Sequence, residues 1–280
     1  MNYRFLRKIK GYIMLSLSAL AAVIGVVLLF AILYKVIQTG MAGLNLALFT
    51  KDEAPAFMIG EGGMRHAFVG QIILTLVASV IGIPIGIFGG IYLSEYGNSS
   101  KLGRFISSLA DVSISIPTII IGTFIYSLLV KPLGGFNGWA GSAALAVILI
   151  PVIMRTTEES LKLIPWQLRE AALALGTPYY KVIKDIILKS ALTGIFTGVS
   201  LAIARVAGET APLLFTSFNN KYLSANMNEP MPSLTVTIFQ YAGSPYDNWI
   251  ISAWASALVI TVFILLTNII LKYIMKRRSF

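Results

Sequence analysis

The sequence predicts an all-α membrane protein with six transmembrane helices and with both termini in the cytoplasm. Three observations support this fold class: the composition, the length of the apolar segments and the distribution of positive charge. Of the 280 residues, 56% are hydrophobic and only 12% are charged, and the mean hydropathy is +0.80. Soluble domains average about a quarter charged residues. We therefore expect residues 1–280 to form a single transmembrane domain.

Six segments are long and apolar enough to cross a bilayer, or nearly so, since a crossing takes about 20 residues in a helix. The fourth is the shortest. The first follows four basic residues, as a signal peptide does, but its apolar run exceeds the about 7–15 residues of a signal peptide and no clear cleavage site follows. We expect a retained N-terminal helix, followed by core helices within about 68–273. The six predicted spans are Tyr12–Tyr34, Phe68–Leu93, Ser113–Val130, Ala140–Met154, Ala191–Phe215 and Trp249–Tyr273.

The positive charges set the orientation, because Lys and Arg gather in cytoplasmic loops. With the N-terminus inside, sixteen of the 22 Lys and Arg residues lie on the cytoplasmic side and five lie outside. Arg205 is the remaining one and falls within a span. The net charge of +10 thus reflects membrane topology, and we expect no nucleic-acid partner. The predicted location is the cell membrane, with several passes.

Several predicted spans contain proline, which can kink a helix. We interpret Pro84 and Pro117 as features of bundle geometry alone. Pro212 differs, because with Gly208 it could loosen the fifth span. Outside the membrane, Leu234–Gln240 could be a short amphipathic helix or a re-entrant segment, and the pattern does not decide between them.

An ionisable pair lies within the fifth span. Arg205 and Glu209 are four residues apart in the apolar stretch Leu201–Phe215, so they are predicted to share one face of a helix. Charges at membrane depth are costly and usually functional. The pair could line a substrate pathway or could tie two helices together, and Thr210 could add a hydroxyl contact.

Catalytic chemistry has little support in the sequence. The chain contains no cysteine and one histidine, His66, so neither a thiolate site nor a histidine cluster for a metal is available. An integral-membrane enzyme would need a nucleophile, a base or a metal cluster. No G-x-x-x-x-G-K-[ST] loop is present, so any ATP hydrolysis would be done by a separate chain.

The longest cytoplasmic segment, residues 155–189, is predicted to form two short helices. Thr156 and Glu159 match a capping box at the start of the first. Pro165 is suited to a first helical position.

Gly176 marks the turn between these helices, because glycine readily adopts the left-handed conformation past a helix end. Thr177 would cap the second helix, with Pro178 at its first position. Small and apolar residues recur every three to four positions before the turn. This surface either docks a partner or packs against the chain's own bundle. The recurring residues are Leu168, Ala171, Ala172 and Leu175.

These residues resemble a known family. Glu170-Ala-Ala172, Gly176 and the apolar Ile186–Leu188 match the EAA loop of ABC-importer permeases. That pattern usually ends in proline, and here Lys189 takes its place, as it does in the permeases of the Pst phosphate importers. The stretch Ala202–Thr216 is also similar to the A-subunit permeases of the Pst system.

The resemblance implies a type I, MetI-like permease bundle in an ATP-driven importer of inorganic phosphate. It also implies four kinds of partner besides membrane lipid: phosphate, a second permease subunit (PstC-like), an ATPase dimer (PstB-like) and a phosphate-binding protein (PstS-like). No cofactor is expected in this chain, because ATP and Mg would be bound by the partner ATPase.

The resemblance also assigns roles to residues. Glu170, Ala171, Ala172 and Gly176 would couple the chain to the ATPase, and we call residues 155–189 the coupling loop. Arg205, Glu209 and Thr210 would lie on the substrate pathway. A permease for another oxyanion, such as molybdate or phosphonate, remains an alternative. A stand-alone secondary anion transporter is another, although the Arg205–Phe215 motif has no second copy.

Overall fold

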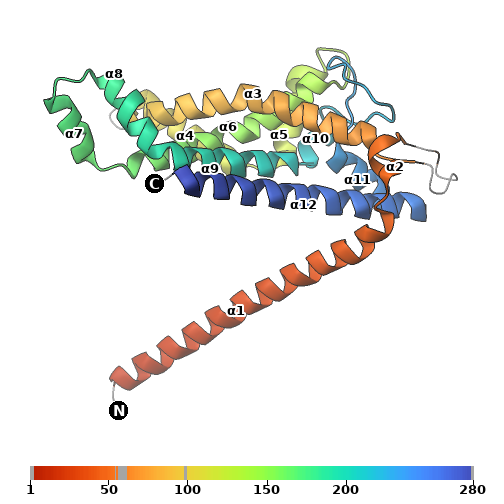
Figure 1. Ribbon diagram of the computed structural model, residues 1–280, viewed down its shortest axis with the longest axis horizontal. Helices are drawn as coiled ribbons and strands as arrows, with labels where there is room; N and C mark the ends of the chain where they lie inside the picture. Colours follow the sequence, from red (N-terminus) through yellow and green to blue (C-terminus); the bar gives the residue numbers. More distant parts are fainter. Residues whose placement is uncertain (1–2, 54, 56–61, 98–99, 279–280) are drawn as a thin grey trace.

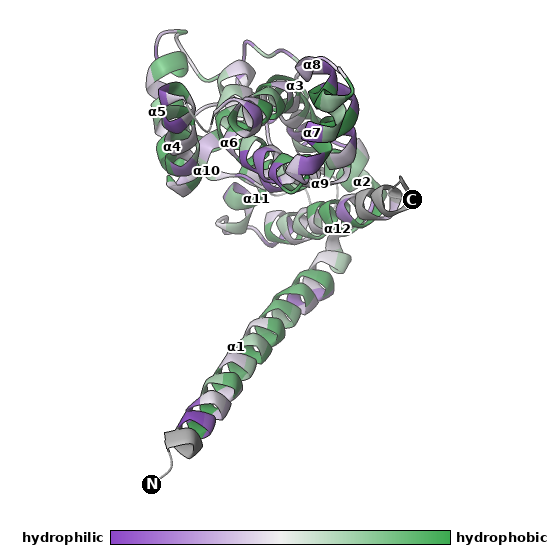
Figure 2. Cartoon of the chain, turned by 90° about the vertical axis from the view of Figure 1, so that its left-hand side faces the viewer, coloured by the Kyte–Doolittle hydropathy of each residue, from purple (hydrophilic) through white to green (hydrophobic). Residues whose placement is uncertain are grey.

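The computed structural model describes residues 3–53, 55, 62–97 and 100–278. It begins with a long helix, α1 (Tyr3–Gly40), that projects from the rest of the molecule (Figure 1). Figure 2 shows that this helix is largely hydrophobic, and its apolar window is fully exposed in the isolated chain. The first predicted span is therefore confirmed, and its surface is available to lipid or to another subunit.

The base of α1 is fixed to the last helix by close backbone contact. A Cβ atom at Gly40 would lie 2.7 Å from the Trp254 carbonyl oxygen, and one at Gly43 would lie 2.7 Å from the Ile251 side chain. Small residues allow membrane helices to approach closely. The short η1 (Met41–Gly43) and α2 (Leu46–Thr50) then lead toward the bundle.

Beyond α2, Arg65 donates hydrogen bonds of 2.8 and 3.1 Å to Asp52. The Arg65 guanidinium holds the pKa of the Asp52 carboxyl below its usual value.

Two central helices form the middle of the bundle, α3 (Arg65–Glu95) and α6 (Gly138–Lys162). Three glycines on α3, each four residues from the next, face α6. A Cβ at Gly86 would lie 2.7 Å from the Ile153 Cβ, and one at Gly90 would lie 2.6 Å from the Met154 carbonyl oxygen. The same row includes Gly82. This stripe lets the two backbones pack closely, as small-residue stripes do in membranes.

The third predicted span, Ser113–Val130, is wrong as a continuous helix. The chain forms α4 (Lys101–Ser115) and then α5 (Thr118–Ile125), which continues into the π-helical segment η2 (Tyr126–Val130). The two parts are bent by 107°. Ile116 is extended, at φ −71° and ψ 132°, because the residue before a proline avoids the helical region. The chain therefore turns sharply at Pro117, which corrects its interpretation as simple bundle geometry.

The fourth span is longer than predicted. Helix α6 continues past Met154 to Lys162, so the capping box at Thr156 is also wrong. Thr156 lies in the interior of α6, where its hydroxyl donates a 3.0 Å hydrogen bond to the Val152 carbonyl oxygen. A threonine that bonds back to its own helix no longer caps one.

The second half of the chain holds the remaining helices. α7 (Trp166–Ala174) lies in the coupling loop, and α8 (Tyr179–Lys181), η3 (Val182–Ile187) and α9 (Leu188–Ala207) run on as one helix from Tyr179 to Ala207. Next come the short helices α10 (Ala211–Leu214) and α11 (Leu234–Ala242), and then α12 (Asp247–Arg278). The predicted pair of short helices is therefore one short and one long helix.

The segment Leu234–Gln240, for which the sequence left two interpretations open, lies in helix α11. Ser233 caps it, and its whole first turn, from Leu234 to Thr237, is buried, as is Tyr241. The Tyr241 ring stacks on Trp249 of α12 at 4.7 Å between centroids. Burial, together with the nearby Glu53 carboxylate, raises the pKa of Tyr241.

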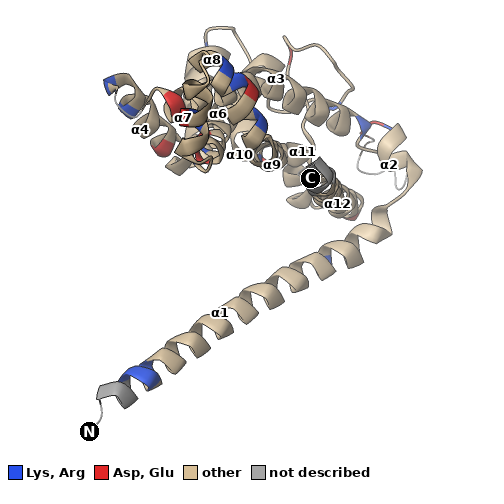
Figure 3. Ribbon diagram, turned by 60° about the vertical axis from the view of Figure 1, so that its left-hand side comes forward, with Lys and Arg blue, Asp and Glu red and all other residues tan. Residues whose placement is uncertain are grey.

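In the described residues, five helices can span a membrane, or six if the bent pair α4–α5 counts as one span. α7 and α8 lie at one end of the bundle, toward which α12 and the first residues of α1 also point (Figure 1). Charged residues gather around α7 and α8 and at the start of α1, while the long helices carry few (Figure 3). This distribution agrees with the predicted orientation, in which both termini and the coupling loop are cytoplasmic.

We expect Gly122→Leu to destabilise the bundle, because α5 contacts α10 there. A Cβ at Gly122 would lie 2.7 Å from the Pro212 Cα, and a backbone atom cannot rotate away. Overpacking of this kind costs about 1–3 kcal/mol. The unfolding midpoint of the purified chain in detergent should fall. Gly135→Leu is the control, because a Cβ there meets nothing within 4 Å, and an equal fall in both variants would contradict the close contact.

Candidate functional site

The predicted ionisable pair lies where the fifth span breaks. α9 ends at Ala207, and Gly208 caps it. Arg205 is in the last turn, whereas Glu209 lies beyond the helix, so the prediction that both share one helix face is wrong. The two side chains are still close, with 3.8 Å between Arg205 Nε and Glu209 Oε1. The loosening predicted from Gly208 and Pro212 is confirmed, and it leaves a loose ion pair.

The pair is asymmetric in its exposure. The Arg205 side chain is 45% exposed in the isolated chain, and that of Glu209 is 16% exposed. Thr210 follows directly and begins the turn into α10, with no side-chain cap bond. The guanidinium therefore faces outward from this subunit, where a substrate or a second subunit could reach it.

Neighbouring helices fix the position of the break. The Thr235 hydroxyl of α11 donates a 2.8 Å hydrogen bond to the Glu209 carbonyl oxygen. Pro212 is buried against Gly122 of α5. This hydrogen bond gives the Glu209 carbonyl, which lies outside any helix, a partner and ties α11 to the charged pair.

A polar stripe follows α9 from its cytoplasmic part toward Arg205. Ser190, Thr193 and Thr197 are exposed and Ser200 is half-buried. Three of these hydroxyls donate to carbonyl oxygens one turn earlier, at 2.7–2.8 Å. This stripe was not predicted, although the spacing of three to four residues is visible in the sequence.

The coupling loop turns sharply at Gly176. The residue has a φ of +77°, which confirms the predicted left-handed position, and nothing lies within 4 Å of its Cβ direction. Pro165 and Pro178 each directly precede a helix, one position earlier than predicted, so Thr177 does not cap α8. Figure 1 shows α7 and α8 as two arms that meet at this turn, away from the bundle.

The coupling loop presents apolar side chains to solvent. Leu175 is 86% exposed and Leu163 is 82% exposed, and Ala171 and Glu170 are exposed as well. The Trp166 ring nitrogen donates a 2.9 Å hydrogen bond to Glu170 Oε1. Further exposed apolar residues here are Trp166, Leu168, Leu173 and Tyr180. Of the predicted apolar stripe only Ala172 is buried.

A buried ion pair behind α7 was missed in the sequence. Arg169 and Glu95, with side chains 5% and 1% exposed, are 2.8 Å apart. The Tyr179 hydroxyl donates a 2.9 Å hydrogen bond to the other carboxylate oxygen of Glu95. We call these three residues the Glu95 cluster. Arg169 directly precedes Glu170, but a single charged residue in a polar loop does not by itself reveal burial.

A second polar contact ties α4 to α6. Arg155 forms ion pairs with Asp111 and with Glu158, and it donates to the Ser107 carbonyl oxygen at 2.7 Å. The bent segment α4–α5 is thereby joined to the cytoplasmic half of α6.

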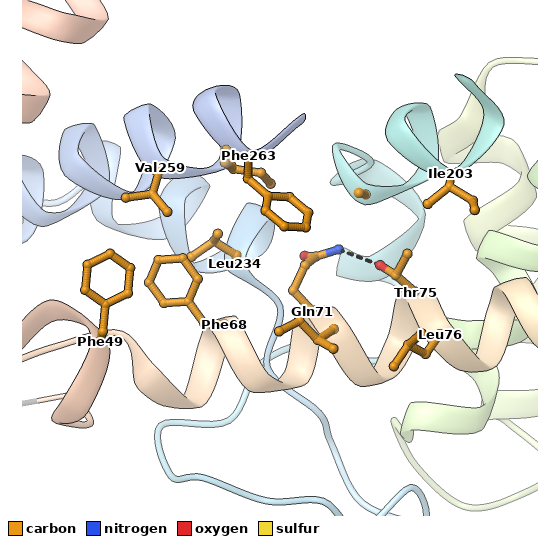
Figure 4. Close-up of a pocket in the computed structure, with 12 residues that line it drawn as sticks. Phe49, Phe68, Gln71, Thr75, Leu76, Ile203, Leu234, Val259 and Phe263 are labelled. Carbon is orange, nitrogen blue, oxygen red and sulfur yellow. Dashed lines mark hydrogen bonds between the residues drawn. The ribbon is translucent and has the colours of Figure 1, made fainter. Parts of the chain in front are cut away.

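The structure also contains an apolar cavity of about 400 Å³ between α3, α9 and α12 (Figure 4). Phe68, Phe263 and Ile203 are among its lining side chains, and its polar contacts come from Gln71 and Thr75, which share a 3.3 Å hydrogen bond. An oxyanion would lose its hydration there without gaining a cation. The cavity therefore does not fit an anionic substrate.

Among the residues that the structure describes, no group of three or more His, Asp or Glu side chains could hold a metal ion. His66, for which the sequence predicted no metal role, is fully buried near the start of α3.

Comparison with known proteins identifies the family. The profile described as "Binding-protein-dependent transport system inner membrane component" matches residues 82–280. This chain belongs to that permease family. The phosphate transport system permease protein PstA of Yersinia pestis is 45% identical over 273 residues, which cover 98% of this chain and 92% of that protein. The resemblance to Pst-system permeases is confirmed, and so are the membrane location and the expectation that the chain is not an enzyme.

Two solved structures support the fold. A bacterial ABC transporter involved in the import of the acidic polysaccharide alginate superposes with a TM-score of 0.66 at 14% identity and covers 98% of this chain and 99% of that chain. An inward-facing structure of the MetNI methionine ABC transporter superposes with a TM-score of 0.59 at 21% identity and covers 76% and 92%. The predicted ABC-importer permease bundle is therefore confirmed.

Proposed function

We propose that this chain is the membrane-spanning permease subunit of an ATP-driven importer of inorganic phosphate. The single observation that carries the proposal is its 45% identity, over nearly its whole length, to a phosphate transport system permease. The exposed Arg205 at the break in α9 supports it. A guanidinium suits a phosphate group because its planar fork donates two parallel hydrogen bonds to the oxygens.

The proposed pathway follows the exposed polar face of α9. Phosphate would meet Arg205 at the helix end, with Thr210 beside it, and would then pass the hydroxyls of Thr197 and Thr193 toward the cytoplasm. Hydroxyls bonded to their own helix tolerate apolar surroundings, but the guanidinium does not. The face that carries Arg205 is therefore the one that a second permease subunit (PstC-like) would cover.

The partners follow from the same reasoning. An ATPase dimer (PstB-like) would bind the exposed apolar residues of the coupling loop, with Glu170, Ala171 and Gly176 in contact and Ala172 packed behind them. ATP and Mg would be bound by that ATPase, with no cofactor in this chain. A phosphate-binding protein (PstS-like) would deliver the substrate at the opposite end of the bundle.

The decisive experiment is uptake of radiolabelled phosphate into vesicles that contain this chain with its companion subunits. We expect uptake that requires ATP, the ATPase and the binding protein. ATP-driven uptake of molybdate or phosphonate in preference to phosphate would identify a permease for another oxyanion. Uptake by this chain alone, driven by a proton gradient, would identify a secondary transporter.

We expect Glu209→Gln to reduce discrimination against sulfate. Phosphate carries a proton near neutral pH, which a carboxylate can accept as a hydrogen bond, whereas sulfate carries none and is repelled. The amide keeps the size but loses the charge and the pure acceptor character. The measurement is phosphate uptake with sulfate as competitor. If the variant is slow but fully selective, Glu209 only pairs with Arg205. Glu229→Gln, in the exposed outer loop, is the control.

A further inference from the structure

The Glu95 cluster places a buried carboxylate where a helix disfavours it. Glu95 is the last residue of α3, and the C-terminal end of a helix carries partial negative charge. Its side chain is only 1% exposed. A carboxylate in this position needs compensation, and Arg169 supplies it through bonds of 2.8 and 3.3 Å to both oxygens. A buried carboxylate at the C-terminal end of a helix is locally unfavourable, and locally unfavourable arrangements are typical of functional positions.

Arg169 also holds the end of α6. Its guanidinium donates a 3.1 Å hydrogen bond to the Leu161 carbonyl oxygen and a 2.9 Å bond to the Ile164 carbonyl oxygen. Leu161 lies in the last turn of α6, where its carbonyl also accepts a 3.2 Å hydrogen bond from the Ile164 backbone N–H, and Ile164 lies just beyond the end of the helix. One side chain of α7 therefore fastens the cytoplasmic ends of both α3 and α6.

Tyr179 extends the contact to the fifth span. It is the first residue of the helix that continues as α9 to Ala207, and its hydroxyl bonds to Glu95. Its ring also packs edge-on against Tyr96, which follows α3, with 5.9 Å between centroids. Thus Glu95 meets both arms of the turn at Gly176, one through Arg169 and one through Tyr179.

We propose that Glu95, Arg169 and Tyr179 are positioning residues that join the coupling loop to α3 as one rigid unit, so that ATPase movement reaches α3 as well as α9. The inference rests on the proposed function only in assuming that ATP hydrolysis by the partner ATPase drives the movement. Because α3 packs along α6 through its glycine stripe, a shift of α3 moves the centre of the bundle.

The test uses the assembled complex and the double variant Glu95→Gln with Arg169→Gln. Removing both charges avoids an uncompensated buried ion, and such replacements are often neutral for stability. Since the natural chain has no cysteine, spin labels can be attached at Phe88→Cys in α3 and Gln167→Cys in α7. We expect the label distance to be the same without nucleotide and with trapped ATP in the natural chain, and to change between the two states in the double variant.

The functional readout is phosphate taken up per ATP hydrolysed, which we expect to fall about tenfold in the double variant while the ATPase stays bound. Tyr179→Phe keeps both charges and the ring and should lower the ratio less. Tyr222→Phe is its matched control, because that tyrosine is 77% exposed in the outer loop, outside the coupling loop, and the ratio should not change. If the double variant does not assemble, the comparison of Tyr179→Phe with Tyr222→Phe decides.

Two results would overturn the inference: a label distance that changes between the two states in the natural chain, or an uptake ratio unchanged in both the double variant and Tyr179→Phe. The label distance depends on ATP and not on the substrate. If the natural complex hydrolyses ATP but carries no phosphate, the proposed function fails, and the label measurement still decides the role of the Glu95 cluster.

Discussion

Replacing Arg205 with glutamine is expected to reduce phosphate uptake about 100-fold while the complex still assembles. Removing one side of a charged, hydrogen-bonded contact costs about 2–5 kcal/mol, and glutamine can offer only one neutral amide to the phosphate oxygens. Assembly should survive, because the Arg205 side chain is 45% exposed and its ion pair with Glu209 is loose at 3.8 Å. Uptake in reconstituted vesicles and co-purification of the subunits measure the two effects.

Lys189→Gln is the matched control for this prediction. It also removes one positive charge from α9, and its partner, Asp185, is one turn away at 3.3 Å. Lys189 lies near the cytoplasmic start of the helix and should affect uptake little. Normal uptake by Arg205→Gln would exclude Arg205 from the pathway. An equal loss in both variants would show that uptake responds to charge on α9 in general.

The sequence predicted the membrane spans well where apolar length alone decides. The helices that contain Tyr12–Tyr34, Phe68–Leu93 and Trp249–Tyr273 are present and extend beyond these limits. Ser113–Val130 failed because hydropathy does not register a change of direction. Pro117 carried that information, since the residue before it must leave the helical region. Because Pro117 lies inside an apolar run, we interpreted it as bundle geometry within one continuous span.

The helix boundaries in the coupling loop were a second feature that the sequence predicted poorly. Thr156 and Glu159 match a capping box, yet α6 continues through both. A short polar side chain can either cap the start of a helix or donate to a carbonyl oxygen one turn earlier in the same helix. Only the packing of the folded chain decides which bond forms. Gly176 was predictable because its conformation excludes most other residues, and its φ of +77° agrees.

The candidate site was partly visible. Arg205 and Glu209 stand out because charge is rare in spans, and the structure places them near each other, though not on one helix. Glu95 and Arg169 could not be found in the same way. They are 74 residues apart, and each occurs in a polar cytoplasmic segment where a charged residue is ordinary. Their pairing depends on the fold bringing the end of α3 beneath α7.

Replacing Gly176 with valine is expected to uncouple ATP hydrolysis from transport. A β-branched residue at a φ of +77° is strained by about 1–2 kcal/mol, so the turn between α7 and α8 should relax to a different angle. The exposed Leu175 and Tyr180 on either side would then no longer fit one surface of the ATPase. Stimulation of ATP hydrolysis by phosphate and its binding protein should be lost, and membrane insertion should be normal.

Two controls separate this effect from general strain. Gly134 has a φ of +82°, also lacks neighbours within 4 Å, and lies in a predicted outer loop. Gly134→Val therefore introduces the same backbone strain at the opposite side of the membrane and should leave stimulated hydrolysis intact. Gly176→Asn should retain much of the coupling, because asparagine tolerates the left-handed conformation. If Gly176→Val binds and stimulates the ATPase normally, the angle at this turn does not determine coupling, and the exposed apolar side chains must act independently of it.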